Sequence, residues 1–106
     1  GTWGTEIHPD LDRQDSDVLI TKHRVSPFWG TSLEVYLRSK NVKNLYISGV
    51  STAVAVQSTV RDAHDRDYAC TVLSDCCASA TPEETELSLS MMTRFAKIIK
   101  ADEIEL

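Results

Sequence analysis

This sequence of 106 residues lacks long hydrophobic runs, clusters of basic residues and an even number of cysteines. No apolar run approaches the roughly 20 residues that a helix needs to span a bilayer. The start of the chain also lacks the basic and hydrophobic segments of a signal peptide. These absences argue against a membrane protein or a secreted one, and they make the cytoplasm the expected compartment.

The charge balance is acidic rather than basic. The chain carries 11 Lys and Arg against 16 Asp and Glu, a formal net charge of −5, and its sequence pI is about 5.0. Nucleic acids and anionic membranes are bound by clustered Lys and Arg side chains, and no such cluster is present. We therefore expect no nucleic-acid or membrane partner, which leaves small molecules and other proteins.

The three cysteines do not form an evident disulfide or metal set. Cys76 and Cys77 are adjacent, a spacing that strains a mutual disulfide, and Cys70 is left without a partner. A metal site or a relocated nucleophile at Cys76 and Cys77 is the sharper alternative. Zinc prefers four ligands, however, and no second Cys/His pair lies at ligand spacing. Reduced thiols and no metal are the prediction.

Hydrophobic patterning predicts strands that alternate with helices within a single domain covering residues 1–106. The composition, 42% hydrophobic and 25% charged, suits one globular unit. Lys22 follows the first strand, and the strand at 45–50 is apolar enough to be covered on both faces. The second helix would turn Val56, Val60 and Ala63 inward. The predicted strands are 17–21, 45–50, 69–73 and 96–99, and the predicted helices are 31–40, 53–67 and one that begins at Thr81-Pro82.

This alternation predicts right-handed crossovers and a mainly parallel, three-layer α/β/α fold. In such folds ligands bind beyond the carboxyl ends of the strands. Lys22, residues 49–52 and Asp75 would converge there. The passage from the strand at 45–50 into the next helix is the most informative feature, because backbone N–H groups at a helix N-terminus stabilise negative charge.

Four segments, in order, resemble the isochorismatase-like hydrolases, also called the cysteine hydrolase family. Residues 1–9 (GTWGTEIHP) resemble the family pattern G-[ST]-x-G-x-E-[IL]-x-P, and residues 22–33 resemble K-x-R-x-S-x-F-x-x-T-x-L. Residues 49–63 resemble G-[VI]-x-T-x-x-C-V-x-x-T-x-x-D-A, and residues 75–78 resemble D-A-C-A. The resemblance covers nearly the whole chain and implies a Rossmann-like α/β fold.

The resemblance also implies a site. Family members cleave amide, carbamoyl or related bonds with an aspartate, a lysine and a cysteine, and Lys22 matches the lysine. The turn would contain a cis peptide between Val50 and Ser51. Backbone N–H groups of Ser51 and Ala55 would form the oxyanion hole, in a pocket at Val50, Ser51, Thr52 and Ala55.

Two parts of the family triad are not matched. The cysteine position falls on Ala55, whose methyl group cannot act as a nucleophile, and Ala53 replaces a polar residue. The aspartate would lie upstream of Gly1, on a strand that these residues do not include. We therefore expect a truncated family domain. Three explanations of Ala55 stay open. The nucleophile was lost naturally, or it was replaced by engineering. Alternatively, the chain is similar to family members that hydrolyse a vinyl ether with an aspartate and water.

Other polar and aromatic residues have simpler readings. Lys22 alone would be a surface lysine at a strand end, and Ala55 alone would be packing at a helix start. His8 occupies a family metal position but lacks its companion motif, and His23 and His64 read as half-exposed. The aromatic residues near the expected pocket mouth read as core or subunit contacts rather than a substrate platform. They are Trp3, Phe28 and Trp29.

Two functions therefore stand side by side. The first is an isochorismatase-family hydrolase of a small amide, carbamoyl or vinyl-ether substrate, with Lys22 and position 55 at its centre. The second is a non-catalytic binding or assembly protein that retains the pocket. For both functions we expect a small-molecule substrate or ligand and a homo-oligomer, and we expect no cofactor.

Overall fold

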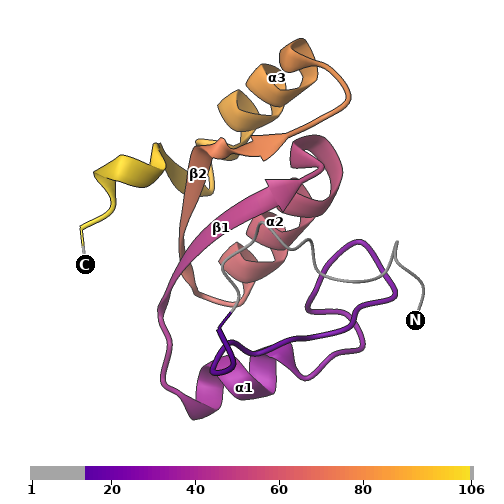
Figure 1. Cartoon of the computed structure of the whole chain (residues 1–106), viewed down its shortest axis with the longest axis vertical. Helices are drawn as coiled ribbons and strands as arrows, with labels where there is room; N and C mark the ends of the chain where they lie inside the picture. The colour runs from indigo at the N-terminus through magenta and orange to yellow at the C-terminus, as the bar shows by residue number, and fades with distance from the viewer. Residues whose placement is uncertain (1–13, 106) are drawn as a thin grey trace.

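The computed structural model describes residues 14–105. Its sheet has three strands in the order β1-β2-β3, and both pairs are parallel. The expected α/β fold class with a parallel sheet is confirmed. Figure 1 shows β1 and β2 side by side, with a helix following each of them. The strands are β1 (Asn44–Val50), β2 (Ala69–Ala78) and β3 (Ala96–Ile99).

Three α-helices and two short helical turns complete the described chain. Helix α1 (Leu33–Ser39) precedes β1, and α2 (Gln57–Asp65) and α3 (Pro82–Met92) follow β1 and β2. A π-helical turn, η2 (Thr52–Val56), leads into α2, and a 3₁₀ turn, η3 (Ala101–Glu103), follows β3. None of the helices in the described part is long and apolar enough to cross a membrane.

The predicted strand at residues 17–21 is wrong, since this segment is a loop. Val18 and Leu19 are 51% and 63% exposed. A strand needs a neighbour that takes up its backbone hydrogen bonds, and within residues 14–105 no strand pairs with this segment. An apolar run indicates β propensity but not whether a neighbouring strand is present. Because residues 17–21 form a loop, Lys22 also lies on a loop rather than at the end of a strand.

The remaining elements differ from expectation mainly at their ends. Helix α1 is shorter than the predicted 31–40 because the chain leaves the helix at Asn41, whose φ is +56°. The predicted helix 53–67 is divided into η2 and α2, since the Val56 N–H reaches back five residues to the Ser51 carbonyl at 3.1 Å. Strand β2 runs on to Ala78, five residues beyond the expected end at Leu73.

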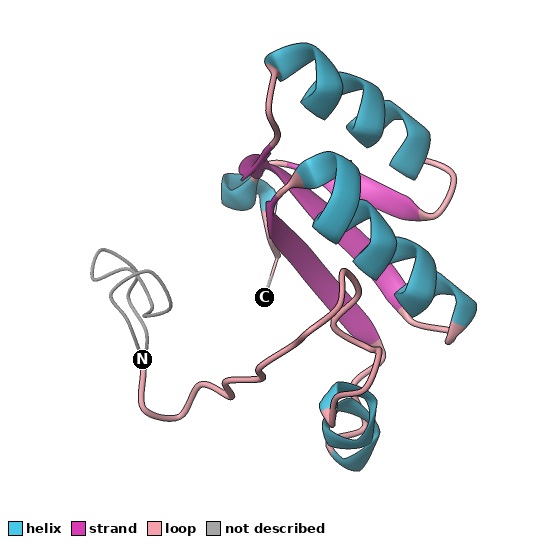
Figure 2. Ribbon diagram, turned by 90° about the vertical axis from the view of Figure 1, so that its right-hand side faces the viewer, coloured by secondary structure: helices cyan, strands magenta, loops and turns pink. Residues whose placement is uncertain are grey.

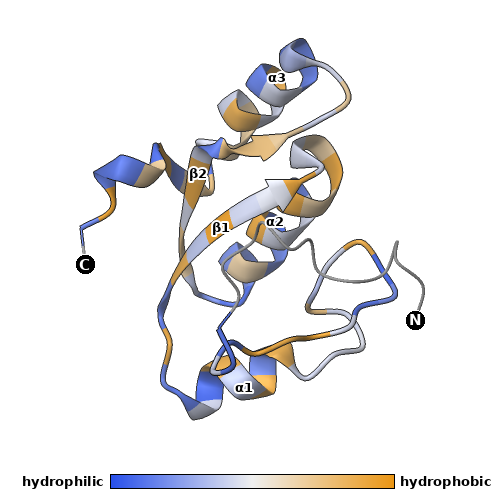
Figure 3. Ribbon diagram, in the orientation of Figure 1, coloured by the Kyte–Doolittle hydropathy of each residue, from blue (hydrophilic) through white to orange (hydrophobic). Residues whose placement is uncertain are grey.

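The core lies between the sheet and the helices that pack on one of its faces. Val60, Ala63, Val72 and Met92 are completely buried, and the inward residues expected for α2 are confirmed. Figure 2 shows α2 and α3 on the same side of the strands. Figure 3 shows hydrophobic residues along β2 and where β1 leads into η2.

The expectation that β1 is covered on both faces is wrong for the described chain. Ile47 on the helix side is 8% exposed, whereas Tyr46 and Val50 on the other face are 47% and 73% exposed. No described helix packs on that second face. The apolar sequence of β1 therefore did not predict that one of its faces is exposed.

Candidate functional site

The strand–turn–helix corner forms where the sequence predicts it. Strand β1 ends at Val50, the Val50–Ser51 peptide is cis as the resemblance implied, and η2 begins at Thr52. Gly49 has a φ of +136°, a conformation that side-chain-bearing residues rarely adopt. Ser51 returns to extended backbone before the helix. The chain therefore passes from strand to helix within two residues.

Hydrogen bonds fix the first turn of η2. The Ser51 carbonyl accepts the N–H groups of Val54 and Val56 at 3.3 and 3.1 Å, and the Ala53 N–H donates to the Ser79 hydroxyl at 3.3 Å. The N–H groups of Ser51 and Ala55 are not donors in these bonds. N–H groups at the start of a helix lack intrahelical acceptors and favour an anionic partner. The corner is thus suited to bind a carbonyl or carboxylate oxygen.

The four expected pocket residues differ in accessibility. Val50 is exposed, Ser51 and Ala55 are half-buried, and Thr52 is completely buried. The Thr52 hydroxyl has no hydrogen-bond partner in the described chain. A ligand at the corner would therefore meet the side chains of Val50 and Ala55, while Thr52 contributes packing beneath the turn.

Lys22 lies on an exposed loop and interacts with that loop. Its Nζ donates to the carbonyls of Arg24 and Val25 at 3.0 and 3.3 Å. Among residues 14–105, no hydrogen bond or ion pair joins Lys22 to Val50, Ser51 or Ala55. The catalytic role of Lys22 stays a prediction. The contacts that are present direct the ammonium group toward its own loop.

Strand pairing places residues 77–79 beside the corner. Gly49 pairs with Cys77 and Val50 with Ala78, after an irregularity in the register. Asp75 was expected to converge on the site, but its carboxylate accepts the Ala101 N–H at 2.9 Å and so holds η3. The wall beside the corner is therefore formed by Cys77 to Ser79, which the sequence analysis did not single out for this role.

All three thiols are free and are unlike an activated nucleophile. Burial raises the pKa of Cys70. Burial also raises the pKa of Cys77, and a hydrogen bond with the Gly49 backbone opposes that change. For the exposed Cys76, desolvation and then the charge of Asp75 raise the pKa. A reactive thiol needs a lowered pKa, so none of the three resembles a relocated nucleophile.

The two histidines in the described part of the chain, His23 and His64, are not grouped with other metal ligands. His64 packs edge-on against Phe95, with ring centroids 5.2 Å apart, and His23 is exposed. His8 and Trp3 lie outside the described residues. Within residues 14–105, no group of three or more His, Cys, Asp and Glu side chains is arranged to hold a metal ion.

An arginine that the sequence analysis missed, Arg66, ties the loop that carries Lys22 to the helices. Arg66 forms ion pairs with Glu34 of α1 at 3.2 Å and with Asp62 of α2 at 3.3 Å, and its guanidinium lies over the ring of Phe28. Arg38 lies 4.4 Å above the Tyr68 ring. The sequence offered one signal, because Phe28 was expected to be a core or subunit-contact residue and is 6% exposed.

Comparison with known proteins identifies the architecture. The family model described as the isochorismatase domain matches residues 1–103. An isochorismatase-like hydrolase from Alkaliphilus metalliredigens is 36% identical with a TM-score of 0.93, covering 97% of this chain and 57% of that one. N-carbamoylsarcosine amidase from Thermoplasma acidophilum is 28% identical with a TM-score of 0.89, covering 100% and 61%.

The curated relatives are longer enzymes. Ureidoacrylate amidohydrolase RutB from Acinetobacter baylyi is 37% identical over 84 residues, which are 79% of this chain and 34% of the relative. The chain thus spans about a third of the length of the curated relatives it matches. The match of the family model to residues 1–103, together with the corner that the structure contains, shows that this chain belongs to the isochorismatase family.

Proposed function

We propose that this chain is part of a hydrolase that acts on a small amide or carbamoyl compound, or on a vinyl ether, with its pocket at the β1–η2 corner. The observation that carries the proposal is the corner itself, which places the Ser51 and Ala55 backbone at the start of a helix beside an exposed Val50. The relatives named as amidohydrolase and amidase support a small-amide substrate.

In this proposal the backbone carries most of the chemistry. The N–H groups of Ser51 and Ala55 would stabilise the negative charge that develops on the substrate oxygen, which is commonly the largest contribution to such reactions. Lys22 would bind an anionic group, or its positive charge would lower the pKa of a neighbouring acidic side chain. Position 55 would be the family nucleophile position, and its methyl group rules out acyl transfer to this side chain.

The methyl group at Ala55 also favours a second function, a non-catalytic protein that binds a small ligand at the same corner. An aspartate that activates water would support the hydrolase, since that route needs no thiol. Without such a group the pocket would only bind. Neither function requires a cofactor.

The proposed protein is cytoplasmic and homo-oligomeric. The three free thiols are typical of a reducing compartment, which supports the cytoplasm. The exposed Tyr46 and Val50 provide apolar surface, which supports a homo-oligomer.

The test is a cysteine at position 55 in the full-length protein. Ala55→Cys should produce a thiol that iodoacetamide labels at pH 7 faster than Cys70, Cys76 or Cys77, because helix N–H groups and Lys22 would lower its pKa. Val54→Cys is the matched control, since Val54 is 50% exposed on the same turn. Equal labelling rates at 54 and 55 would contradict the placement of the site.

Activity assays then separate the two functions. The unmodified protein should hydrolyse a panel of ureido, carbamoyl and vinyl-ether compounds slowly or not at all. Gain of amidase activity in Ala55→Cys would support descent of this protein from an active hydrolase of the family. Ligand binding without turnover in both forms would support the binding protein.

A further inference from the structure

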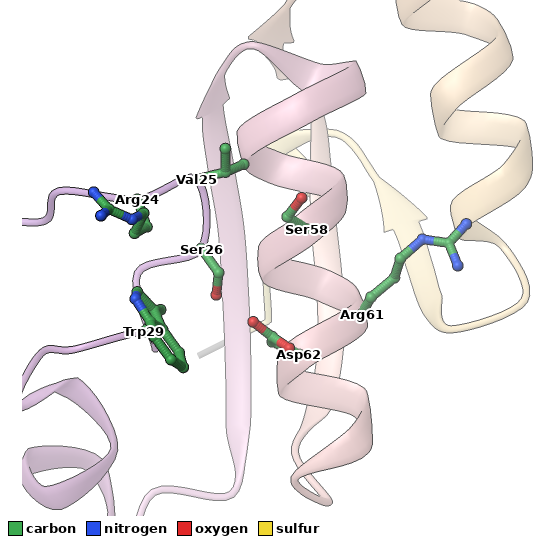
Figure 4. Close-up of a pocket in the computed structure, with 7 residues that line it drawn as sticks. All are labelled: Arg24, Val25, Ser26, Trp29, Ser58, Arg61 and Asp62. Atoms are coloured by element: carbon green, nitrogen blue, oxygen red, sulfur yellow. The ribbon is translucent and has the colours of Figure 1, made fainter.

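We propose that a cavity between the 24–29 loop and α2 is a binding site for a small neutral amide or urea with an aromatic or other flat substituent. The cavity has a volume of about 560 Å³, and its walls include Trp29 and Ser26 of the loop and Ser58 and Asp62 of the helix. Figure 4 shows Ser26 and Trp29 of the loop on one side of the gap and Ser58 and Asp62 of the helix on the other. The inference does not depend on Lys22 or on residue 55.

The cavity walls hold hydrogen-bonding groups that the described chain leaves unused. The Ser26 hydroxyl oxygen accepts the Phe28 N–H at 3.2 Å, so its own O–H remains free to donate. Oδ1 of Asp62 is paired with Arg66. Within residues 14–105, neither Oδ2 of Asp62 nor the Ser58 hydroxyl has a hydrogen bond or ion pair. The cavity thus offers both a free acceptor and free donors.

An amide or urea matches this combination. Its N–H groups would donate to Asp62 Oδ2, and its carbonyl oxygen would accept from Ser26 or Ser58. Satisfying such groups at once is what gives a small polar ligand its orientation in a pocket. A hydrocarbon would leave these groups unpaired, and removing them from water without partners costs free energy.

The loop adds a flat apolar wall. Trp29 is 68% exposed, a large fraction for an indole ring, and Val25 is 45% exposed. The neighbouring Phe28 is buried under Arg66, which anchors the backbone that carries Trp29. An exposed aromatic ring on an anchored backbone is suited to stack against a flat ligand.

Charge favours a neutral ligand over an ammonium ion. Arg24 and Arg61 also belong to the cavity walls, and Arg66 already neutralises Asp62. Three guanidinium groups against one carboxylate oppose a cation. Asp62 faces the gap in Figure 4, and its unpaired Oδ2 opposes an anion.

The experiment measures binding of phenylurea to the full-length protein by ligand-observed NMR. Ser58→Ala should weaken binding about fivefold through loss of one hydrogen bond. Trp29→Ala should weaken it about tenfold, while Trp29→Phe keeps a stacking ring and most of the affinity. Val35→Ala, at a residue of α1 that is 72% exposed, is the matched control and should change nothing.

Three results would overturn the site. They are phenylurea binding that neither Ser58→Ala nor Trp29→Ala weakens, equal binding of N,N-dimethyl-N′-phenylurea, which lacks the terminal NH₂ donors, and tighter binding of benzylammonium. Circular dichroism confirms that each variant is folded. The labelling rate of Ala55→Cys reports on the corner alone, so failure here leaves the proposed function untouched.

Discussion

The guanidinium carbon of Arg66 lies 4.9 Å from the centroid of the Phe28 ring and thereby joins α2 to the loop that carries Lys22. The same guanidinium forms the ion pairs with Glu34 and Asp62. The loop and α1, which are neighbours in sequence, therefore meet the distant α2 at one side chain. Loss of this contact should loosen the loop while leaving the sheet intact.

We expect Arg66→Ala to lower the free energy of unfolding by about 1–2 kcal/mol. Both ion pairs are partly exposed and are worth little each, so most of the loss comes from the cation–π contact and the packing of the side chain. Urea denaturation measures the change. A double-mutant cycle with Phe28→Leu should give a coupling of about 0.5–1 kcal/mol, and a coupling near zero would disprove the contact.

Adjacent methionines of α3 provide a sharper test of the core. Met92 is completely buried, whereas Met91 is 45% exposed. Met92→Ala should therefore cost about 2–5 kcal/mol, because it removes buried surface and leaves a cavity. Met91→Ala should change the free energy of unfolding by less than about 0.5 kcal/mol. Similar losses at both positions would mean that α3 packs on the sheet with a different face.

The start of α3 depends on a side-chain cap. The Thr81 hydroxyl oxygen accepts the Glu84 N–H at 3.1 Å, and Pro82 occupies the first helical position. Thr81→Ala should cost about 1 kcal/mol, and Thr81→Ser, which keeps the hydroxyl, should cost much less. Thermal unfolding followed by circular dichroism measures both. Equal losses in the two variants would show that the methyl group of Thr81, not its hydroxyl, is what matters.

Local signals predicted this part of the structure well. Thr81 followed by Pro82 and two acids marks a helix start through hydrogen bonding and helix-dipole chemistry that involve only neighbouring residues. The same holds for the inward face of α2 at Val60 and Ala63, since a 3.6-residue period is a local property. The corner at residues 49–52 was also found, through the resemblance of its sequence to the family turn.

Non-local partners were beyond reach of the sequence. The segment with Val18 and Leu19 has the composition of a strand, yet strand formation depends on a neighbour far away in sequence. The sequence around Arg66 gives no sign of a contact with a distant segment. The contact of Arg66 with Phe28, 38 residues earlier, depends on where the loop crosses α2. For the same reason the cavity beside Trp29 could not be seen in the sequence.

The last prediction concerns the stability of the fold at alkaline pH. Cys70 is 7% exposed and burial raises its pKa, so the folded state holds the thiol proton more firmly than the unfolded state does. Below the ordinary thiol pKa of about 8.5 both states are protonated and the stabilising effect is complete. As the pH rises through that value, the unfolded chain loses its proton first, and the free energy of unfolding falls until the folded pKa is passed.

The comparison that isolates this effect is Cys70→Ala. The difference in free energy of unfolding between the unchanged protein and Cys70→Ala should be constant below about pH 8 and should decline above it, because other titrating groups are common to both. Urea denaturation at a series of pH values measures it. Met91→Ala, at an exposed residue that carries no titrating group, provides the control, since its difference should not change with pH. A difference for Cys70 that does not fall at high pH would mean that the thiol ionises as easily in the folded chain as in the unfolded one, and that its burial beside Val72 has been misassigned.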